Sequence, residues 1–244
     1  MKGGTEALRT ALGADYEWVY ASIGSASTEE TWWADPPNGK GAATTDRNHA
    51  SAMISAVNTI VDNQGPFYGI IGYSQGAAAV PVYLSQATTG TFEMAAMFCG
   101  YLTTTHTGLL DQVNEQSPFG GIPALIWMST ADSVISNDMS VGLVPKFTSP
   151  AVVVANPGPG HTVPTSSDDT FESVLTFFRD PNTTALDRNF AGLPEPKAGT
   201  CTCYWYADRC FGYTGASKAK LLKDAGKDAE TASSSDGCRF SENE

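Results

Sequence analysis

The chain has few basic residues, few histidines and, over its first 200 residues, a single cysteine. Only 14 Lys and Arg stand against 26 Asp and Glu, so the chain lacks the clustered positive charge with which proteins bind nucleic acid. No apolar run reaches the ~18 residues of a membrane-spanning helix, and the opening residues lack the pattern of a secretory signal. We therefore expect no nucleic-acid partner and no membrane span.

The pattern of apolar residues predicts an α/β fold. A chain of 244 residues is long enough for one such domain with a sizeable core, or for a smaller domain with an appendage. Strand-like apolar runs alternate with helical spacings, which favours a mainly parallel sheet with helices on both faces. The periodic signal stops near Asp180. We therefore expect a main domain over residues 1–180 and a separate extension over residues 181–244.

The expected elements follow from these spacings and from turn residues. Between residues 23 and 45 no sustained period appears, so a long loop is expected there, and loops of that length are often functional. Asp46 is the expected N-cap of the second helix. The predicted helices are Thr5–Leu12, Asp46–Asp62, 75–86, Leu109–Gln116, Ser136–Val144 and Phe171–Phe178, and the predicted strands are Tyr16–Ala21, 67–71, Thr91–Cys99, Pro123–Ser129 and Ala151–Ala155.

The stretch from residue 65 to 79 carries the strongest functional pattern. A turn pair, Gly65-Pro66, precedes an apolar run that predicts a buried strand, and small residues suited to a tightly packed helix follow. Between the two lies Gly72-Tyr73-Ser74-Gln75-Gly76, which is G-x-S-x-G in a strand–turn–helix context. The glycines permit a sharp turn that lifts the hydroxyl of Ser74 to the carboxyl edge of the sheet, where ligands bind in such folds. Ser74 is the predicted nucleophile.

A serine nucleophile needs a base, usually a histidine that a carboxylate orients. The chain offers three histidines. His161 follows the last predicted strand in a loop of glycine and proline that could reach over the sheet edge, and it is the predicted base. His106 lies in a threonine-rich loop and is the alternative, as a base or as a pocket wall. His49 precedes the serine in a helical pattern and is expected to be a partly exposed helix residue.

The predicted partner of the histidine is Asp132. Among the acids between Ser74 and His161, it alone lies just beyond the carboxyl end of a predicted strand, at the edge that also carries the serine. Asp138, on the helix that follows, is the alternative. The alternative is a purely structural role for Asp132 as a turn former, which is common for aspartate in such a place.

The oxyanion of an acyl-transfer reaction needs two N–H donors. Gln75, the residue after the nucleophile, is expected to supply one from its main chain, at the positive end of the helix that begins there. The second normally comes from the loop after the first strand of the sheet. The sequence opens with Met1-Lys2-Gly3-Gly4 where that loop is expected to end, so we expect a preceding strand to be missing from it.

The nucleophile segment resembles that of the FSH-type serine hydrolases, a eukaryotic family with the α/β-hydrolase fold. The resemblance extends in order and approximate spacing from about Lys2 to Asp180. Its other matches are Trp32-Trp33, Gly100-Tyr101, Ala131-Asp132 and Gly160-His161-Thr162-Val163-Pro164. The resemblance implies an α/β-hydrolase three-layer sandwich, a triad of Ser74, Asp132 and His161, hydrolysis of carboxylic esters or thioesters, and a cytoplasmic location. It also implies an upstream strand ending in a His-Gly pair, which this sequence does not contain.

We expect no cofactor and no metal for this chemistry, and a small-molecule ester or thioester as the substrate. The residues expected to form the wall of the acyl-binding site are Trp32, Trp33, Tyr73 and Tyr101. For the two tryptophans, packing in the core is an equally good interpretation. Two alternatives stay open: an acyl-protein thioesterase or lysophospholipase-like enzyme, and a hydrolase-fold protein that binds a ligand or partner without catalysis.

The family has no counterpart of the extension. Its first part, Pro181–Lys197, is predicted to be a linker or a strap, and Lys218–Thr231 an exposed helix. It holds four cysteines, which can form disulfides, stay free or bind a metal, although C-x-C is not a usual zinc spacing. Disulfides would indicate an oxidising compartment rather than the cytoplasm. These cysteines are Cys201, Cys203, Cys210 and Cys238, whereas Cys99 is expected to be a buried apolar residue of the main domain.

Overall fold

The computed structural model describes residues 3–23, 31–39, 41–182, 199–206, 209–213 and 230–234. The contacts of the chain divide it into two compact units, Met1–Gly192 and Leu193–Glu244. The predicted boundary near residue 180 stays a prediction, and the proposed linker lies almost wholly outside the described residues. The first unit contains every residue of the candidate site, so it is described first.

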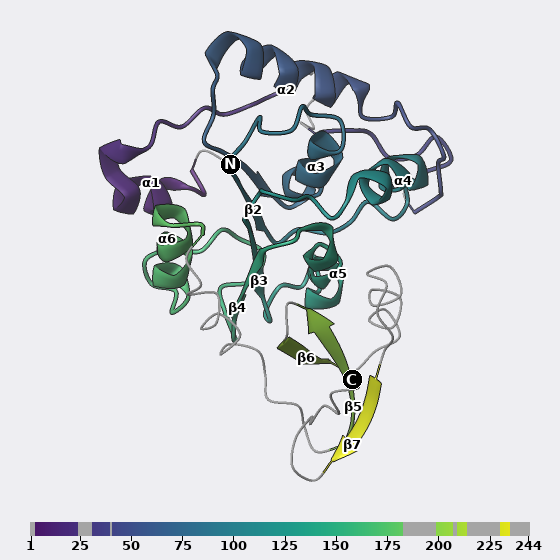
Figure 1. Ribbon diagram of the computed structural model, residues 1–244, viewed down its shortest axis with the longest axis vertical. Helices are drawn as coiled ribbons and strands as arrows, with labels where there is room; N and C mark the ends of the chain where they lie inside the picture. Colours follow the sequence, from purple (N-terminus) through teal and green to yellow (C-terminus); the bar gives the residue numbers. More distant parts are fainter. Residues whose placement is uncertain are drawn as a thin grey trace. The chain divides into compact units, whose positions relative to one another are not determined.

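The first unit is built on a four-stranded parallel sheet (Figure 1). Its strands are β1 (Gly69–Tyr73), β2 (Met94–Phe98), β3 (Ala124–Ser129) and β4 (Pro150–Ala155), and they lie in the order β1-β2-β3-β4. Since all the pairings are parallel, the carboxyl ends of the strands meet at one edge. The register sets the last residue of β1, Tyr73, opposite the last residue of β2, Phe98.

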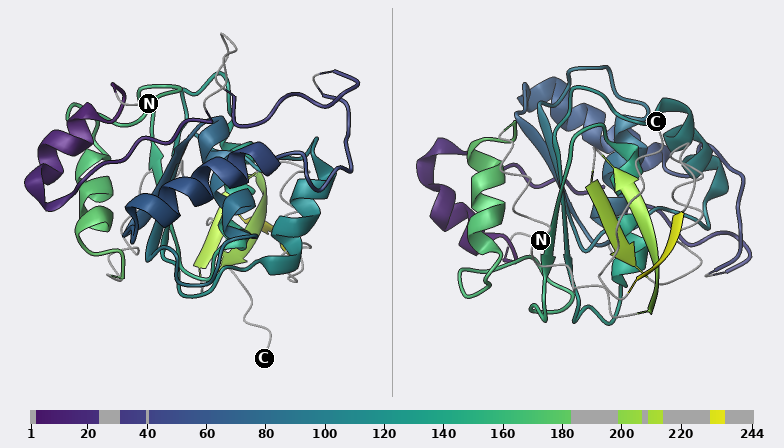
Figure 2. Two further views of the ribbon diagram at one scale, coloured as in Figure 1. Left: turned by 90° about the horizontal axis from the view of Figure 1, so that it is seen from above. Right: turned by 60° about the horizontal axis from the view of Figure 1, so that its bottom comes forward.

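Helices cover both faces of this sheet (Figure 2). Helices α3 (Gln75–Leu84), α4 (Thr107–Gln116) and α5 (Asn137–Val141) follow β1, β2 and β3, and right-handed crossovers between neighbouring strands place them on one face. Helix α2 (Ser51–Gln64) lies beside α3, where Tyr83 donates a hydrogen bond to Asn58. Helices α1 (Glu6–Leu12) and α6 (Phe171–Arg179) cover the opposite face. The predicted three-layer arrangement is confirmed.

The core beneath α1 and α6 is made by alternate residues of the strands, because successive side chains of a strand point to opposite faces. Phe98 and Trp127 pack there with their ring centroids 6.2 Å apart, in the same buried cluster as Phe178 of α6. All positions of β2, β3 and β4 are buried, whereas four of the five positions of β1 are only half-buried. Burial of each large apolar side chain stabilises the fold by about 1.5–3 kcal/mol.

The strand predicted over Tyr16–Ala21 is wrong. The segment is extended but joins no ladder of the described residues, and its side chains attach it to the helical layer instead. Tyr16 donates a hydrogen bond to the carbonyl oxygen of Phe178. The ring of Trp18 packs on the ring of Phe178, with the two centroids 6.3 Å apart. Extended, aromatic-rich sequence forms a strand only where another strand offers a partner.

The other elements lie within a few residues of their predicted positions, with one exception. Helix α2 begins at Ser51 rather than at Asp46, and Ala50 stands at its N-cap. The Asp46 side chain instead accepts a hydrogen bond from the Asn48 N–H in a turn ahead of the helix, which is a common alternative for aspartate. Helices that the described residues form are too short or too polar to cross a bilayer.

The second unit contains a three-stranded antiparallel sheet of β5 (Gly199–Tyr206), β6 (Arg209–Tyr213) and β7 (Glu230–Ser234) in the order β6-β5-β7. The predicted helix Lys218–Thr231 is wrong at its end, because its last two residues belong to β7, and the rest of it lies outside the described residues. Cys238 also lies outside them. The pairing of the four cysteines stays a prediction.

Candidate active site

Ser74 sits in a sharp turn between β1 and α3. Its φ of 53° and ψ of −121° lie in a region that residues with a side chain rarely adopt. The turn requires a residue without a side chain at Gly72, and the missing side chain of Gly76 leaves room for Trp32. A Cβ on Gly72 would lie 2.2 Å from the carbonyl oxygen of Gly76, and a Cβ on Gly76 would lie 3.0 Å from the indole nitrogen of Trp32. The predicted strand–turn–helix context of Ser74 is therefore present.

The structure brings Ser74, His161 and Asp132 into one hydrogen-bonded chain. His161 Nε2 lies 3.0 Å from Ser74 Oγ, and its Nδ1 lies 2.8 Å from Asp132 Oδ2. The serine follows β1, the aspartate follows β3 and the histidine follows β4. Since these strands are parallel, residues far apart in sequence meet at one edge. With a proton on Nδ1, the imidazole offers Nε2 as an acceptor to the serine hydroxyl.

The carboxylate of Asp132 is almost fully buried, with 1% of its side chain exposed. Its Oδ1 accepts hydrogen bonds from the N–H groups of Val134 and Ile135, each at 2.8 Å. Burial on its own raises the pKa of this carboxyl, but hydrogen bonds from His161, from these two N–H groups and from the Cys99 thiol outweigh it and lower the pKa. The carboxylate therefore stays ionised and fixes the proton of the imidazole on Nδ1.

The loop that carries His161 is attached to the ends of the strands below it. Ser129, at the end of β3, accepts a hydrogen bond from the Gly160 N–H at 3.1 Å. The hydroxyl of Tyr73, at the end of β1, donates to the carbonyl oxygen of His161 at 2.8 Å, and the two rings lie 5.1 Å apart. Cys99, just beyond β2, donates to the carbonyl oxygen of Thr162 at 3.4 Å. Each of the three strands thus fixes one point of the loop.

Gln75 has two separate parts in the site. It is the first residue of α3, so its main-chain N–H has no partner within the helix and lies beside the serine. Its side chain accepts a hydrogen bond from the N–H of Trp32 at 2.7 Å and donates one to the carbonyl oxygen of Trp33 at 3.1 Å. The side-chain amide thereby joins residues 31–36, here called the tryptophan segment, to the start of the helix.

The aromatic residues predicted to form an acyl-binding wall have different environments. Trp33 is buried with 5% exposed, which agrees with core packing, whereas Trp32 is half-buried against the start of α3. Tyr101 is also half-buried, and its pKa is raised by burial and then by Asp35 of the tryptophan segment. Tyr73 supports the His161 loop through its hydroxyl. Their roles toward a substrate remain predictions.

The two other histidines lie together, away from the triad. The Nε2 atoms of His49 and His106 lie 3.0 and 3.1 Å from one acceptor, the carbonyl oxygen of Ala34. The two rings are 4.7 Å apart, and His106 also packs against Trp33 at 5.9 Å. Burial first, and then the nearby His49, lower the pKa of His106. Both histidines contact the tryptophan segment through the carbonyl oxygen of Ala34, and the role of His106 as a pocket wall stays a prediction.

Asp138, the alternative acid, lies on α5 and is not the carboxylate that contacts His161. The described residues contain one group of three side chains that could hold a metal ion, Cys99, Asp132 and His161, whose ligand atoms lie within 4.8 Å of one another. A metal would have to displace the protons of the thiol and of Nδ1, and the pKa of the thiol is strongly raised by burial and by Asp132. The donor set therefore does not favour a metal.

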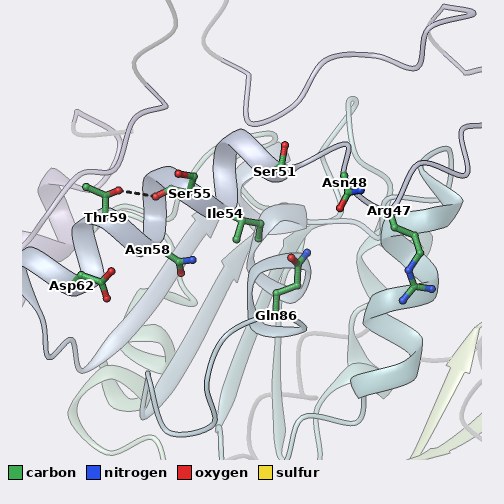
Figure 3. A pocket seen from close by; sticks show the side chains of 9 residues that line it. All are labelled: Arg47, Asn48, Ser51, Ile54, Ser55, Asn58, Thr59, Asp62 and Gln86. Atoms are coloured by element: carbon green, nitrogen blue, oxygen red, sulfur yellow. Dashed lines mark hydrogen bonds between the residues drawn. The ribbon is translucent and has the colours of Figure 1, made fainter.

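A groove of about 390 Å³ runs along α2 (Figure 3) and contains none of the predicted site residues. Its lining is polar apart from Ile54, and its one cation, Arg47, is paired with Glu115 at 2.8 Å. A polar groove of this kind lacks the apolar walls that small-molecule sites usually have. The candidate active site is therefore the sheet edge that carries Ser74, Asp132 and His161.

Comparison with known proteins identifies the family. The sequence pattern of the family described as "Serine hydrolase (FSH1)" matches residues 5–172, which is more than half of the chain. The chain belongs to the FSH1 serine hydrolase family. The match covers the predicted nucleophile, acid and base, and the resemblance inferred from the motifs is confirmed. The parallel sheet with helices on both faces is that of an α/β-hydrolase.

Several relatives are named as esterases. The chain is 29% identical to "Esterase OVCA2" of Danio rerio over 177 residues, covering 68% of this chain and 76% of that protein. It is 27% identical to "Esterase GA18864" of Drosophila pseudoobscura pseudoobscura over 159 residues, covering 62% of this chain but only 53% of the fly protein. The esterase domain of a Rhodothermus marinus protein, a solved structure, aligns with a TM-score of 0.41 at 16% identity over 52% of this chain and 66% of that chain.

Sequence reasoning missed the contacts that support the site. The bonds of Gln75 to the tryptophan segment and of Tyr73 to the His161 carbonyl involve main-chain groups, which leave no trace in a residue pattern. Cys99 was correctly expected to be buried, but its contact with the His161 loop was not foreseen. A usable signal existed, because Cys99 ends a predicted strand at the edge that also carries Ser74.

Proposed function

We propose that the protein is a serine hydrolase that cleaves carboxylic esters or thioesters through an acyl-enzyme. The observation that carries this proposal is the chain of hydrogen bonds from Ser74 Oγ through His161 to Asp132. In the first step Oγ attacks the carbonyl carbon of the substrate while its proton passes to Nε2 of His161. Asp132 stabilises the imidazolium that forms.

The negative charge then lies on the former carbonyl oxygen. The main-chain N–H of Gln75, at the positive end of α3, is the donor that we assign to it. The tetrahedral intermediate collapses as His161 gives its proton to the leaving alcohol or thiol, which departs. Water, with His161 again as the base, then attacks the acyl-enzyme and releases the acid. Every atom and proton in this cycle is supplied by the substrate, water and these side chains.

The chemistry of the candidate triad and the relatives that are named as esterases support this substrate class. Esters and thioesters share the acyl-enzyme step and differ only in the leaving group. The tryptophan segment, which Gln75 joins to the nucleophile turn, is the wall that we assign to the acyl group. An acyl-protein thioesterase-like substrate belongs to the same mechanism and differs only in the alcohol or thiol that leaves.

The test is hydrolysis of p-nitrophenyl esters and of acyl thioesters over a series of chain lengths, together with labelling by a fluorophosphonate probe. We expect turnover and labelling in the natural chain, and Ser74→Ala should abolish labelling and lower kcat by at least about 10⁴-fold. The matched control is Ser55→Ala, an exposed serine on α2, which should change neither. Absence of turnover and labelling in the natural chain, or equal activity in Ser74→Ala, would contradict the proposal and favour a binding protein.

A further inference from the structure

Cys99 lies beside the triad, yet no step of the proposed reaction uses it. It directly follows β2, the strand between those that lead to Ser74 and to Asp132, and its side chain is 0% exposed. Its φ of 49° falls in the left-handed region. Among the described non-glycine residues, only Ser74 shares a positive φ. Residues keep such a backbone where surrounding contacts hold them in it, and these positions cluster at functional sites.

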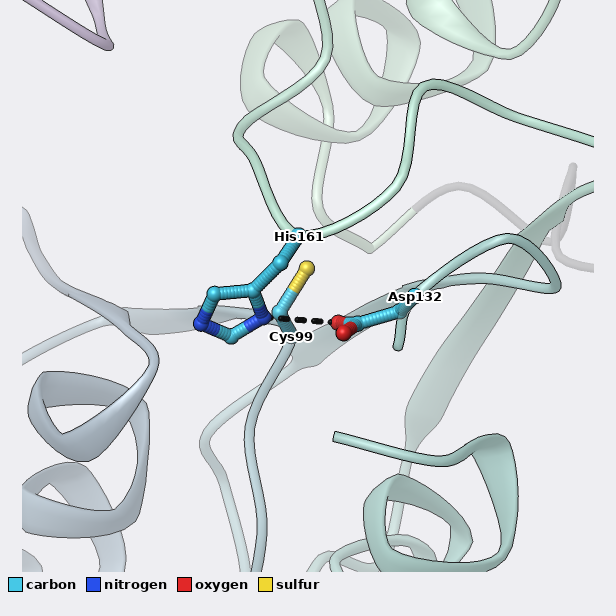
Figure 4. A group of neighbouring side chains, drawn as sticks. All are labelled: Cys99, Asp132 and His161. Atoms are coloured by element: carbon cyan, nitrogen blue, oxygen red, sulfur yellow. Dashed lines mark hydrogen bonds and ion pairs between the residues drawn. The ribbon is translucent and has the colours of Figure 1, made fainter. Parts of the chain in front are cut away.

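Figure 4 shows the Cys99 side chain beside those of His161 and Asp132, and its thiol also lies near two main-chain acceptors of the His161 loop. Its Sγ lies 3.4 Å from the carbonyl oxygen of Thr162 and 3.9 Å from that of Gly160, the residues on either side of His161. It also lies within 4.8 Å of the Asp132 carboxylate and of His161 Nδ1. One sulfur atom therefore contacts both sides of the histidine and faces the acid.

The charge state of the thiol decides what it can do there. Burial first, and then hydrogen bonding and proximity to Asp132, raise the pKa of Cys99 far above its usual value. A thiolate at this point would place a second anion against the Asp132 carboxylate. The thiol is consequently neutral, and a neutral thiol is neither a nucleophile nor a metal ligand. What remains to it is the role of a hydrogen-bond donor with one proton.

We propose that Cys99 is a positioning residue of this serine hydrolase, whose thiol donates its one proton among the acceptors around His161, of which the Thr162 carbonyl oxygen is the nearer main-chain one, and so keeps the imidazole aimed at Ser74. The inference rests on the proposed function. It explains why a residue with a side chain occupies a left-handed position next to the nucleophile turn. His161 itself lies in a loop, and a displacement of about 1 Å at a reacting group can cost about 100-fold in rate.

The test compares three variants. Cys99→Ala removes the donor, Cys99→Ser keeps one, and Val153→Ala makes a void in the same buried cluster from β4 without removing a hydrogen-bond donor. We expect Cys99→Ala to lower kcat about tenfold while KM changes less than about twofold, because the contact orients the base rather than binding the substrate. Cys99→Ser should recover most of the loss. Val153→Ala should keep kcat within about twofold of the natural chain, although its thermal midpoint should fall by about as much as that of Cys99→Ala.

A second readout is independent of turnover. The proton on His161 Nδ1, bonded to Asp132, gives a low-field proton NMR resonance, assigned by its loss in His161→Gln. It should be present in the natural chain, Cys99→Ser and Val153→Ala, and broadened by solvent exchange in Cys99→Ala. If the natural chain shows the resonance but neither hydrolyses esters nor reacts with the fluorophosphonate probe, the proposed function is contradicted. The resonance in the variants would then be the test of the positioning role.

Three results would overturn the proposal. One is a folded Cys99→Ala variant with the kcat and the low-field resonance of the natural chain. Another is a folded Cys99→Ser variant that is as impaired as Cys99→Ala, because the donor would then be irrelevant. The last is an equal loss of kcat in Val153→Ala, since packing alone would then account for the effect.

Discussion

Replacement of Asp132 by asparagine tests the assignment of the acid most directly. Oδ1 accepts two main-chain N–H bonds, from Val134 and Ile135, and Oδ2 accepts the proton on His161 Nδ1. An asparagine would keep its carbonyl oxygen on the two N–H groups, because its amide group cannot accept them. Its NH₂ group would then face Nδ1. Because NH₂ is a donor, Nδ1 can accept a hydrogen bond from it only when Nδ1 carries no proton. The imidazole would carry its proton on Nε2 and could not take one from Ser74.

The size of the effect follows from that loss of the correct tautomer. In other serine triads the same change lowers kcat by about 10⁴-fold with little change of geometry, and we expect a comparable loss in this chain. The assay is ester hydrolysis with the rate of fluorophosphonate labelling measured in parallel, and both should fall together. The control is Asp138→Asn on α5, which should keep kcat within about twofold. A folded Asp132→Asn variant with more than a tenth of the natural kcat, or an equal loss in Asp138→Asn, would refute the reasoning.

Two further predictions concern stability. Gly72→Ala would place a Cβ 2.2 Å from the Gly76 carbonyl oxygen, and should reduce the free energy of unfolding in urea by about 3 kcal/mol or prevent folding. The control is Gly120→Ala, because a Cβ at Gly120 has no atom within 4 Å. Equal stabilities of the two variants would contradict the prediction. Because the folded state lowers the pKa of His106, the unfolded state binds more protons below about pH 6.5, so stability should fall as the pH drops through that value. The free energy of unfolding, measured in urea between pH 8 and pH 5, should depend less steeply on pH in His106→Gln than in the natural chain. An unchanged dependence on pH would contradict the prediction.

The sequence was sufficient to locate the residues of the candidate triad. Ser74 and His161 are 87 positions apart, and His161 and Asp132 are 29 apart, yet each follows a strongly apolar strand. Parallel strands carry their carboxyl ends to one edge, so strand order and a turn motif were enough to predict the meeting. This reasoning works because the periods of buried strands and amphipathic helices are local properties of a chain.

Predictions failed where the outcome depends on a partner elsewhere. Tyr16–Ala21 has the composition of a strand, but a ladder needs a neighbour, and the segment instead attaches to α6 through Tyr16 and Trp18. Asp46 has the chemistry of an N-cap, but its turn with Asn48 competes for the same side chain. In both cases the intrinsic preference was real, and tertiary or local competition decided the structure.

The two non-glycine residues with a positive φ in the described part of the chain, Ser74 and Cys99, show how the sheet edge itself builds the site. Tyr73 and Phe98 are paired in the register of β1 and β2, so Ser74 and Cys99 are equivalent positions, each the first residue beyond a paired strand end. Both residues have a positive φ, 53° at Ser74 and 49° at Cys99. At the first position it presents a hydroxyl to Nε2 of His161, and at the second it directs a thiol to the main chain around that histidine. A positive φ just beyond two neighbouring strands thus serves the two proposed tasks, exposing the nucleophile and anchoring its base, and the pairing of β1 with β2 brings the two positions side by side.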